Sequence, residues 1–508
     1  MPFKKQYKQF VLFNIDCMGI PSYFSHIIRN YPNIVYSYFN NKQHFQHLFM
    51  DCNSIIYDVV NTLIKEKEEN INGILETKII DNVIQKIEIY IQMINPTKTI
   101  FIAFDGVAPF AKMKQQRTRR YKSHFLKTFQ IIEKPEQNWD TSNITPGTPF
   151  MKKLSSQIHS YFNSLIIKEK YIKNNLIVST SNEIGEGEHK IFDYIRKNPC
   201  INDNIIVYGL DADLIMLTIF HYSLFKNAYI WRESPEFGID AITSNTMLVL
   251  DIELLRKSIL TELKMDNPHR IYDYVFLCFF LGNDFLPHFP ALNIRTHGIN
   301  TLLNEYCILF KNKPQQFLIS PKGNIEWVNV KKLICMLSMK ETAFLIEECS
   351  YREKFNSWKW NTSNNNQDKI LHNLPIIYRF EEQYISPKNI GWQERYYLTL
   401  FGKGSQDKYS IQDICINYLE GIEWVYNYYN GKIVDWKWAY KYHYGPLFAD
   451  LLSHIPKTNH FQFHNHFQPP CSEEEQLQYV LPLQNSIQPK FQWAFCRYFW
   501  EAHVLFNE

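Results

Sequence analysis

The sequence predicts an α/β fold in its first 300 residues, joined to a second half that is rich in aromatic side chains. Three observations support this prediction. Short apolar runs alternate with amphipathic stretches over the first 300 residues, as they do when strands and helices follow one another along a chain. Several of the apolar runs are followed directly by an acidic residue. Tryptophan and tyrosine are concentrated later, at Trp424–Tyr429 and Trp436–Tyr444.

The individual elements follow from the length and period of the apolar pattern. Strands are expected at His47–Met50, Thr99–Phe104, Leu176–Thr180 and Ile205–Leu210. Helices are expected at Pro21–Tyr31, Ile79–Ile94, Pro149–Leu165, His189–Lys197 and Ile271–Leu281. Thr145 or Thr148 is suited to cap the third of these helices. Polar stretches at 65–70 and 360–369 predict surface loops, and the second separates the α/β half from the aromatic-rich half.

The composition limits the kind of protein this is. With 508 residues, 45% of them hydrophobic, the chain is long enough to bury a large core. The net charge is only +3, so a site for a polyanion must arise from local sorting of charge. The apolar run Val275–Leu281 is far too short to span a membrane, so no membrane partner is expected. The ten cysteines include no C-x-x-C pair and predict reduced thiols in an intracellular protein.

Acidic residues stand where strands or turns are expected to end. Sites in open α/β sheets form beyond the carboxyl ends of strands, so these residues are expected to share one site. Each acid alone is most simply a cap or a surface charge, but packed together they would repel one another unless metal ions lay between them. Oxygen ligands suit Mg²⁺, with Mn²⁺ as a substitute, rather than zinc, and two ions are expected. The seven residues are Asp51, Asp105, Glu186, Glu188, Asp211, Asp213 and Asp284.

A cationic run begins seven residues after Asp105. In KMKQQRTRR, residues 112–120, one helical face presents Lys112, Gln116, Arg119 and Arg120. Guanidinium groups bind phosphate oxygens through paired hydrogen bonds. A compact group of cations favours a terminal phosphate over an internal one, because the terminal phosphate carries more charge. Taken alone the run is equally well a solvated helix face, but metal ligands beside a phosphate site indicate phosphodiester chemistry.

Longer motifs resemble the Xrn-type 5′→3′ exoribonuclease family from about residue 18 to the C-terminus, in matching order and spacing. The segments are MGIPSYF (18–24), MDCNSIIYD (50–58), FDGVAPFAKMKQQRTRRYKS (104–123), ITPGTPFM (144–151), GEGEHKIFDYIR (185–196), YGLDADLIML (208–217), FLGNDFLPHFPAL (280–292), RYYLTLFG (395–402), YLEGIEWVYNYY (418–429) and WKWAYKYHYGP (436–446).

The resemblance implies a processive, Mg²⁺-dependent exonuclease that removes nucleotides from single-stranded RNA with a 5′ monophosphate, in RNA or mRNA decay. It implies a mixed, twisted central sheet flanked by helices, as in PIN-like and flap nucleases, with a mostly helical C-terminal half around the active site. It assigns the seven acids to metal binding and catalysis, and Lys112, Gln116, Arg119 and Arg120 to the 5′-phosphate pocket. It assigns Tyr57 and a tryptophan, Trp436 in preference to Trp438, to stacking on the first bases.

The chain departs from the family pattern at several positions. Family members carry His at the position of Tyr57, Gly at Ser54 and commonly Pro at Ile184. Seventeen residues precede Met18, where members begin. The chain ends near the limit of the catalytic core, a compact form that fits a virus-encoded enzyme acting in the host cytoplasm. A decapping activity acting upstream is an expected partner, and cytoplasm is favoured over nucleus.

The expected organisation is an N-terminal extension at 1–17, a nuclease core at 18–300, a connecting segment at 301–370 and a completing region at 371–508.

The alternative functions are a structure-specific DNA flap endonuclease and a non-catalytic RNA-binding scaffold. The basic run and WKW argue against the first, and the full set of acids argues against the second. His460, His464, His466 and Cys471 match no standard zinc spacing and favour a polar loop. WVYNYY favours core packing.

Overall fold

The computed structural model describes residues 23–38, 43–65, 74–130, 139–234, 247–294, 296–353, 380–404, 408–433, 435–459, 461–463, 466–482, 490–492 and 503–505. The polar loop expected at 360–369, residues 66–70 of the other expected loop, the extension at 1–17, and His460 and His464 lie outside these residues. The expected division of the chain into four regions stays a prediction.

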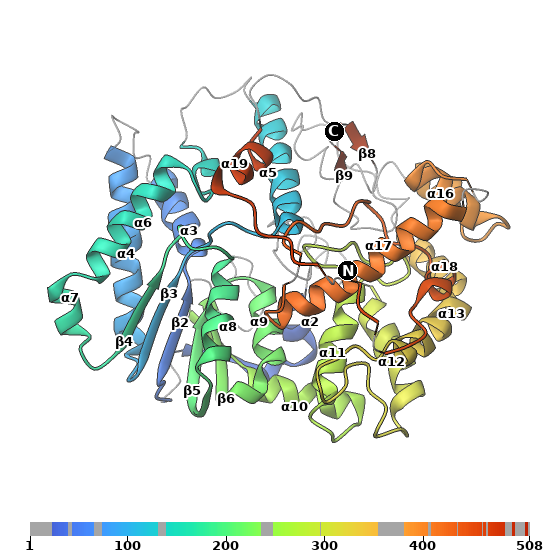
Figure 1. The fold of residues 1–508 in the computed structure, drawn as a ribbon, viewed down its shortest axis with the longest axis horizontal. Helices are drawn as coiled ribbons and strands as arrows, with labels where there is room; N and C mark the ends of the chain where they lie inside the picture. The colour runs from blue at the N-terminus through green and yellow to red at the C-terminus, as the bar shows by residue number, and fades with distance from the viewer. Residues whose placement is uncertain are drawn as a thin grey trace, which may run out of the picture.

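A seven-stranded mixed sheet forms the centre of the α/β part, in the order β1-β7-β6-β5-β2-β3-β4 (Figure 1). Strands β2 to β6 run parallel, while β7 is antiparallel to β6 and β1 is antiparallel to β7. This confirms the expected α/β fold with a mixed sheet. The strands are β1 (Val35–Ser37), β2 (His47–Asp51), β3 (Thr99–Ala103), β4 (Asn175–Ser179), β5 (Cys200–Tyr208), β6 (Phe225–Glu233) and β7 (Met247–Asp251).

Helices cover both faces of the sheet because successive strand residues point to opposite sides and both sets are apolar. Leu48 and Met50 of β2 pack into one core, and Phe49 packs into the other. The first core includes α3 (Asn53–Lys65), α4 (Ile74–Ile94) and α6 (Pro149–Phe162). The second includes α2 (Tyr23–Asn30), α8 (Gly187–Lys197), α9 (Ala212–Phe220), α10 (Ile252–Leu263), α11 (Arg270–Cys278) and the short 3₁₀ helix η5 (Phe279–Leu281).

The expected elements are present, with shifts at their ends. The helix expected at 149–165 ends at Phe162, and α7 (Leu165–Lys170) starts after Ser164. Thr148, not Thr145, caps α6, because its hydroxyl accepts a hydrogen bond from the Met151 amide. Strands β1, β6 and β7 were not predicted.

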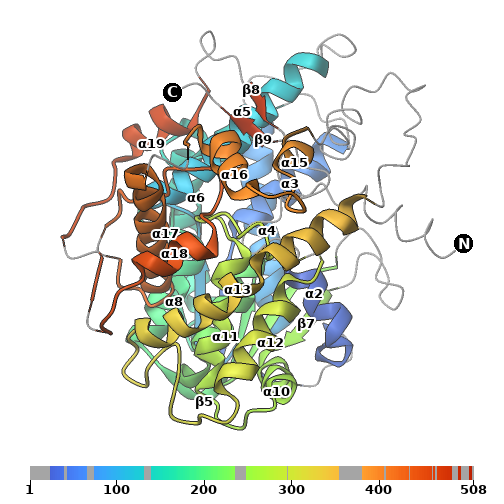
Figure 2. The same cartoon turned by 90° about the vertical axis from the view of Figure 1, so that its right-hand side faces the viewer.

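The second half is mostly helical and rich in buried aromatic residues, as expected (Figure 2). It lies beside the sheet, and its buried side chains join the same core as α8, α9 and α11. Its elements are α12 (Gly298–Phe310), α13 (Trp327–Glu353), α15 (Phe380–Ile385), α16 (Trp392–Phe401), α17 (Lys408–Tyr429), α18 (Phe448–His454), α19 (Glu473–Val480), β8 (Lys490–Gln492) and β9 (His503–Leu505). The long helix α5 (Phe110–Gln130) follows β3 and packs against α19.

None of the described helices is both long enough and apolar enough to cross a membrane.

Candidate active site

The seven acids come from the ends of neighbouring elements. Asp51 is the last residue of β2, and Asp105 follows β3. Glu186 and Asp211 are the residues that precede α8 and α9, and Glu188 and Asp213 stand in the first turns of these helices. Asp284 follows η5. Because β2, β3 and β5 are parallel neighbours, their carboxyl ends meet at one edge and bring Asp51, Asp105 and Asp211 together.

Backbone geometry around Gly187 brings Asp51 and Asp105 to the start of α8. The Gly187 amide donates a 2.7 Å hydrogen bond to Oδ1 of Asp105. Asn53 holds the same carboxylate, since its side-chain amide donates to Oδ2 over 2.5 Å. A Cβ atom at Gly187 would lie 2.6 Å from Oδ1 of Asp51, closer than real Cβ contacts come. Only glycine therefore permits this approach.

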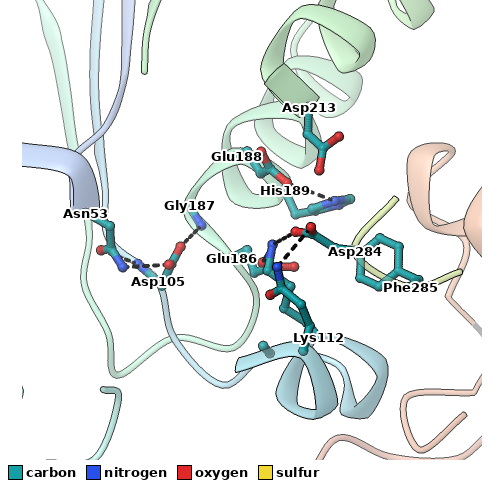
Figure 3. A network of polar contacts seen from close by, with 12 residues as sticks. Asn53, Asp105, Lys112, Glu186, Gly187, Glu188, His189, Asp213, Asp284 and Phe285 are labelled. Atoms are coloured by element: carbon teal, nitrogen blue, oxygen red, sulfur yellow. Dashed lines mark hydrogen bonds and ion pairs between the residues drawn. The ribbon is translucent and has the colours of Figure 1, made fainter. Parts of the chain in front are cut away.

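Lys112 links the acids to α5. Its Nζ lies 2.8 Å from Oε1 of Glu186 and 2.7 Å from Oδ2 of Asp284, and Figure 3 shows it between the two carboxylates. Gln115 donates to the other oxygen of Asp284 over 3.0 Å. Burial alone would lower the pKa of Lys112, but the carboxylates of Asp284 and Glu186 outweigh burial and raise it well above the usual value. Lys112 is therefore a permanent buried cation.

One lysine does not neutralise the cluster. Burial, followed by the charges of Asp105 and Asp211, raises the pKa of Asp51 well above its usual range. Burial and the neighbouring Asp284 raise the pKa of Asp213 to about 8. Burial and Asp213 likewise raise the pKa of Glu188. The carboxylates therefore repel one another, and added positive charge would relieve that repulsion.

The residues fit a divalent metal. Oδ1 of Asp51 is buried and has no hydrogen-bond partner within the described part of the chain. Ligand atoms of Asp51, Glu188 and Asp211 lie within 4.8 Å of one another, as do those of Glu186, Glu188 and His189. These oxygens are hard donors of the kind that hold Mg²⁺ or Mn²⁺. Neither His466 nor Cys471 belongs to a potential metal group among the described residues.

The basic face of α5 begins at this cluster. Arg119 lies close enough to Asp211 to oppose the rise in the pKa of that acid, which burial brings to about 6. Arg120 is half-buried and donates to the Ile144 carbonyl over 3.1 Å. Tyr57 lies close enough to Arg120 to oppose part of the lowering of the Arg120 pKa that burial causes. The amide oxygen of Gln116 is buried without a hydrogen-bond partner among the described residues.

The two tryptophans of WKW differ in their surroundings. Trp438 is buried and stacks on Trp424, with 5.3 Å between ring centroids and 25° between ring planes. Trp436 is half-buried, and its carbonyl accepts a 2.9 Å hydrogen bond from the Phe110 amide at the start of α5. Tyr57, on α3, is also half-buried. Trp436 thus has more exposed surface near α5 than Trp438 does.

Sequence reasoning missed two tyrosines of the site. Tyr428 donates a hydrogen bond to Oε2 of Glu186, and Tyr429 donates to Oδ1 of Asp213 over 3.3 Å. Both are buried at the end of α17, where core packing was expected. The two tyrosines do pack in the core, and this packing also directs their hydroxyl groups toward Glu186 and Asp213. Pattern alone carries no sign of this, because the contacts join residues more than 200 positions apart.

Comparison with known proteins finds two family models that match this chain. The model for the XRN 5′-3′ exonuclease N-terminus matches residues 18–234. The model for the Xrn1 helical domain matches residues 264–375 and 380–493. Together these matches cover most of the chain and include all seven acids, the basic face of α5, and α17.

Curated relatives share similarity over most of this chain. The 5′-3′ exoribonuclease 1 of Homo sapiens is 27% identical over 92% of this chain and 30% of its own length. The enzyme of the same name from Schizosaccharomyces pombe is 26% identical over 92% of this chain and 44% of its own. The 5′-3′ exoribonuclease 2 of Kluyveromyces lactis is 30% identical over 71% of this chain and 43% of its own length. The chain thus spans less than half the length of these relatives.

Among solved structures, flap endonuclease-1 from Methanococcus jannaschii aligns with 58% of this chain and 87% of its own, at 13% identity and a TM-score of 0.25. A similarity this distant does not bear on activity. The two family models, by contrast, match consecutive parts of the chain. Both matched parts contribute acidic residues to the cluster. The chain belongs to the XRN 5′-3′ exonuclease family.

Proposed function

We propose that this protein is a processive 5′→3′ exoribonuclease that degrades single-stranded RNA carrying a 5′ monophosphate in a Mg²⁺-dependent reaction. One observation carries the proposal. A cluster of seven acids, four buried and three half-buried, adjoins the basic face of α5, with Lys112 in contact with both Glu186 and Asp284. This arrangement joins a metal site to a phosphate site, as removal of nucleotides from a phosphorylated end requires.

The carboxylates would hold the metal, with Asp51, Glu188 and Asp211 as one set, and Glu186 and Asp213 close to Glu188. Divalent ions bound there supply activation of water and stabilisation of the leaving oxygen. Lys112 places a buried positive charge next to them. Asn53 and the Gly187 amide hold Asp105 in one orientation. Preorganised charges of this kind act strongly because water is excluded from the site.

The 5′ end of the RNA would be held by α5 and two aromatic rings. Gln116, Arg119 and Arg120 would provide donors for a terminal phosphate, and Tyr57 lies near the Arg120 side chain. The rings of Tyr57 and Trp436 are the half-buried aromatic surfaces that we assign to stacking on the first bases. Each cut leaves a new 5′ monophosphate, so the shortened RNA is again a substrate.

The test is decay of 3′-labelled single-stranded RNA with Mg²⁺, with either a 5′ monophosphate or a 5′ triphosphate. We expect rapid loss of the monophosphate RNA alone, without intermediates, and a loss of about 100-fold or more in rate for Glu188→Gln. The matched control is Asp193→Asn on the same helix, an acid paired with Lys197 near the surface, which should retain activity.

Internal fragments, or equal cutting of both RNAs, would instead favour a flap-type endonuclease. RNA that is bound but never cut would favour a scaffold. Decapping partners, the cellular compartment and a viral source stay predictions, which this assay does not address.

A further inference from the structure

Helix α17, in the helical half of the chain, places two tyrosine hydroxyl groups in contact with the acid cluster. Tyr428 donates to Oε2 of Glu186, and Tyr429 donates to Oδ1 of Asp213 over 3.3 Å. Both tyrosines are 2% exposed, so water does not compete for these bonds. Of the acids they contact, Glu186 directly precedes α8 and Asp213 stands in the first turn of α9.

Aromatic packing holds the Tyr428 ring in one position. It stacks on Trp424, with 5.1 Å between centroids and 15° between planes, and Phe285 meets it at 4.9 Å and 69°. The His189 ring lies 3.5 Å away on another side. A ring confined by three neighbours cannot withdraw its hydroxyl without disturbing the core. The direction of the hydrogen bond to Glu186 is therefore set by packing.

Tyr429 is confined in a similar way. Its ring meets Phe279 at 5.0 Å and Phe220 at 6.0 Å, both edge-on. Phe279 belongs to η5, the element that leads to Asp284, and Phe220 belongs to α9, which carries Asp213. One tyrosine thus packs against the two elements that bring Asp213 and Asp284 to the site.

Each carboxylate is oriented by these contacts. Glu186 is held at both oxygens, at Oε1 by Lys112 over 2.8 Å and at Oε2 by Tyr428. Asp213 is held at Oδ1 by Tyr429. Groups that hydrogen-bond metal ligands fix the ligand's rotation, and their removal commonly weakens metal binding by about 10- to 100-fold.

We propose that Tyr428 and Tyr429 are positioning residues, which fix the carboxylates of Glu186 and Asp213 in the orientation that binds divalent metal. The proposal rests on the proposed function only in that it treats these acids as metal ligands. It follows that the α/β part does not contain a complete site by itself. Helix α17 supplies the hydrogen bonds that set two of its carboxylates.

Tyr426 provides a matched control on the same helix. It is also buried, at 3% exposure, but its hydroxyl donates to the Gly323 carbonyl over 3.0 Å and touches no acid of the cluster. Replacing any of the three tyrosines by Phe removes one buried hydroxyl and keeps the ring. Only the group to which the hydroxyl donates differs.

The experiment measures Mn²⁺ binding to the full chain by electron paramagnetic resonance of the free ion, for wild type, Tyr428→Phe, Tyr429→Phe and Tyr426→Phe. Near-ultraviolet circular dichroism checks that each variant keeps its packing. We expect Tyr428→Phe to weaken Mn²⁺ binding by about tenfold, with a smaller loss for Tyr429→Phe and none for Tyr426→Phe. The Mg²⁺ concentration for half-maximal RNA decay should rise in parallel, while KM for RNA at saturating Mg²⁺ stays within about twofold.

Unchanged Mn²⁺ binding in both Tyr428→Phe and Tyr429→Phe would overturn the proposal. So would equal weakening in Tyr426→Phe, because that would show a general effect of core packing. The binding readout does not depend on nuclease activity. Wild-type protein that binds Mn²⁺ but degrades no RNA would therefore refute the proposed function and leave the positioning role supported by the variants.

Discussion

Gly187 shows how a single residue decides whether the site can form. Its missing side chain lets α8 approach Asp51, and its amide holds Asp105. We expect Gly187→Ala to push Asp51 or α8 aside, because the added methyl would lie 2.6 Å from a carboxylate oxygen. A misplacement of about 1 Å commonly costs about 100-fold in rate, and this is the loss expected in Mg²⁺-dependent RNA decay.

Gly404→Ala is the control for this prediction, since a Cβ atom there meets no atom of the described residues within 4 Å. It should leave RNA decay unchanged. If Gly187→Ala degraded RNA as fast as Gly404→Ala, the close approach of α8 to Asp51 would not matter for the reaction.

Helix α5 has two faces with different roles. On one face Arg119 stands beside Asp211. On the other, Arg117 packs over the rings of Tyr121 and Tyr479 and donates to the Tyr479 carbonyl over 2.6 Å. The two arginines lie two positions apart, so a proposed phosphate-binding cation can be compared with a packing cation in one helix.

We expect Arg119→Ala to raise KM for monophosphate RNA by roughly 10- to 100-fold, because one charge-assisted contact contributes about 1.5–3 kcal/mol. Arg117→Ala should lower the melting temperature through lost packing against α19 and keep the preference for a 5′ monophosphate. Steady-state kinetics on the two RNAs, with thermal melts, separates these effects. An Arg117→Ala variant that alone lost the monophosphate preference would contradict the assignment of the two faces.

Across the whole molecule, the acid cluster is expected to make stability depend on pH and on bound metal. The pKa of Asp211 is raised to about 6 and that of Asp213 to about 8, chiefly by burial. A folded protein with raised carboxyl pKa values binds these protons more tightly than the unfolded chain. This contribution to stability is present at low pH and is lost as pH rises from about 4 through 8.

Mg²⁺ should therefore raise the melting temperature more at pH 8 than at pH 6. At pH 8 more of the carboxylates are already charged, whereas at pH 6 Mg²⁺ must displace protons from them. At a concentration about 100-fold above Kd the gain in stability is about 2.7 kcal/mol. Thermal melts with Mg²⁺, EDTA or NaCl at equal ionic strength measure this. A shift that NaCl reproduces, or that is larger at pH 6, would argue against an assembled metal cluster.

Local pattern sufficed for much of the fold. The strands ending at Asp51 and preceding Asp105 were predicted because a buried strand is a short continuous apolar run. Strands β6 and β7 escaped prediction although they are apolar too. Their signals, NAYIWRE and MLVLD, are short runs that periodicity alone does not assign to strand or helix.

The sequence by itself determined the family, and it predicted that the seven acids and the basic face of α5 share one site, because residue types at set spacings specify local chemistry. It left Trp436 and Trp438 as alternatives for the stacking role, and it showed no link between WVYNYY and the acids. Only the tertiary structure buried Trp438 against Trp424, set Lys112 between Glu186 and Asp284, and directed Tyr428 at Glu186. These outcomes depend on contacts between distant segments, whose directions are decided when helices pack around a sheet.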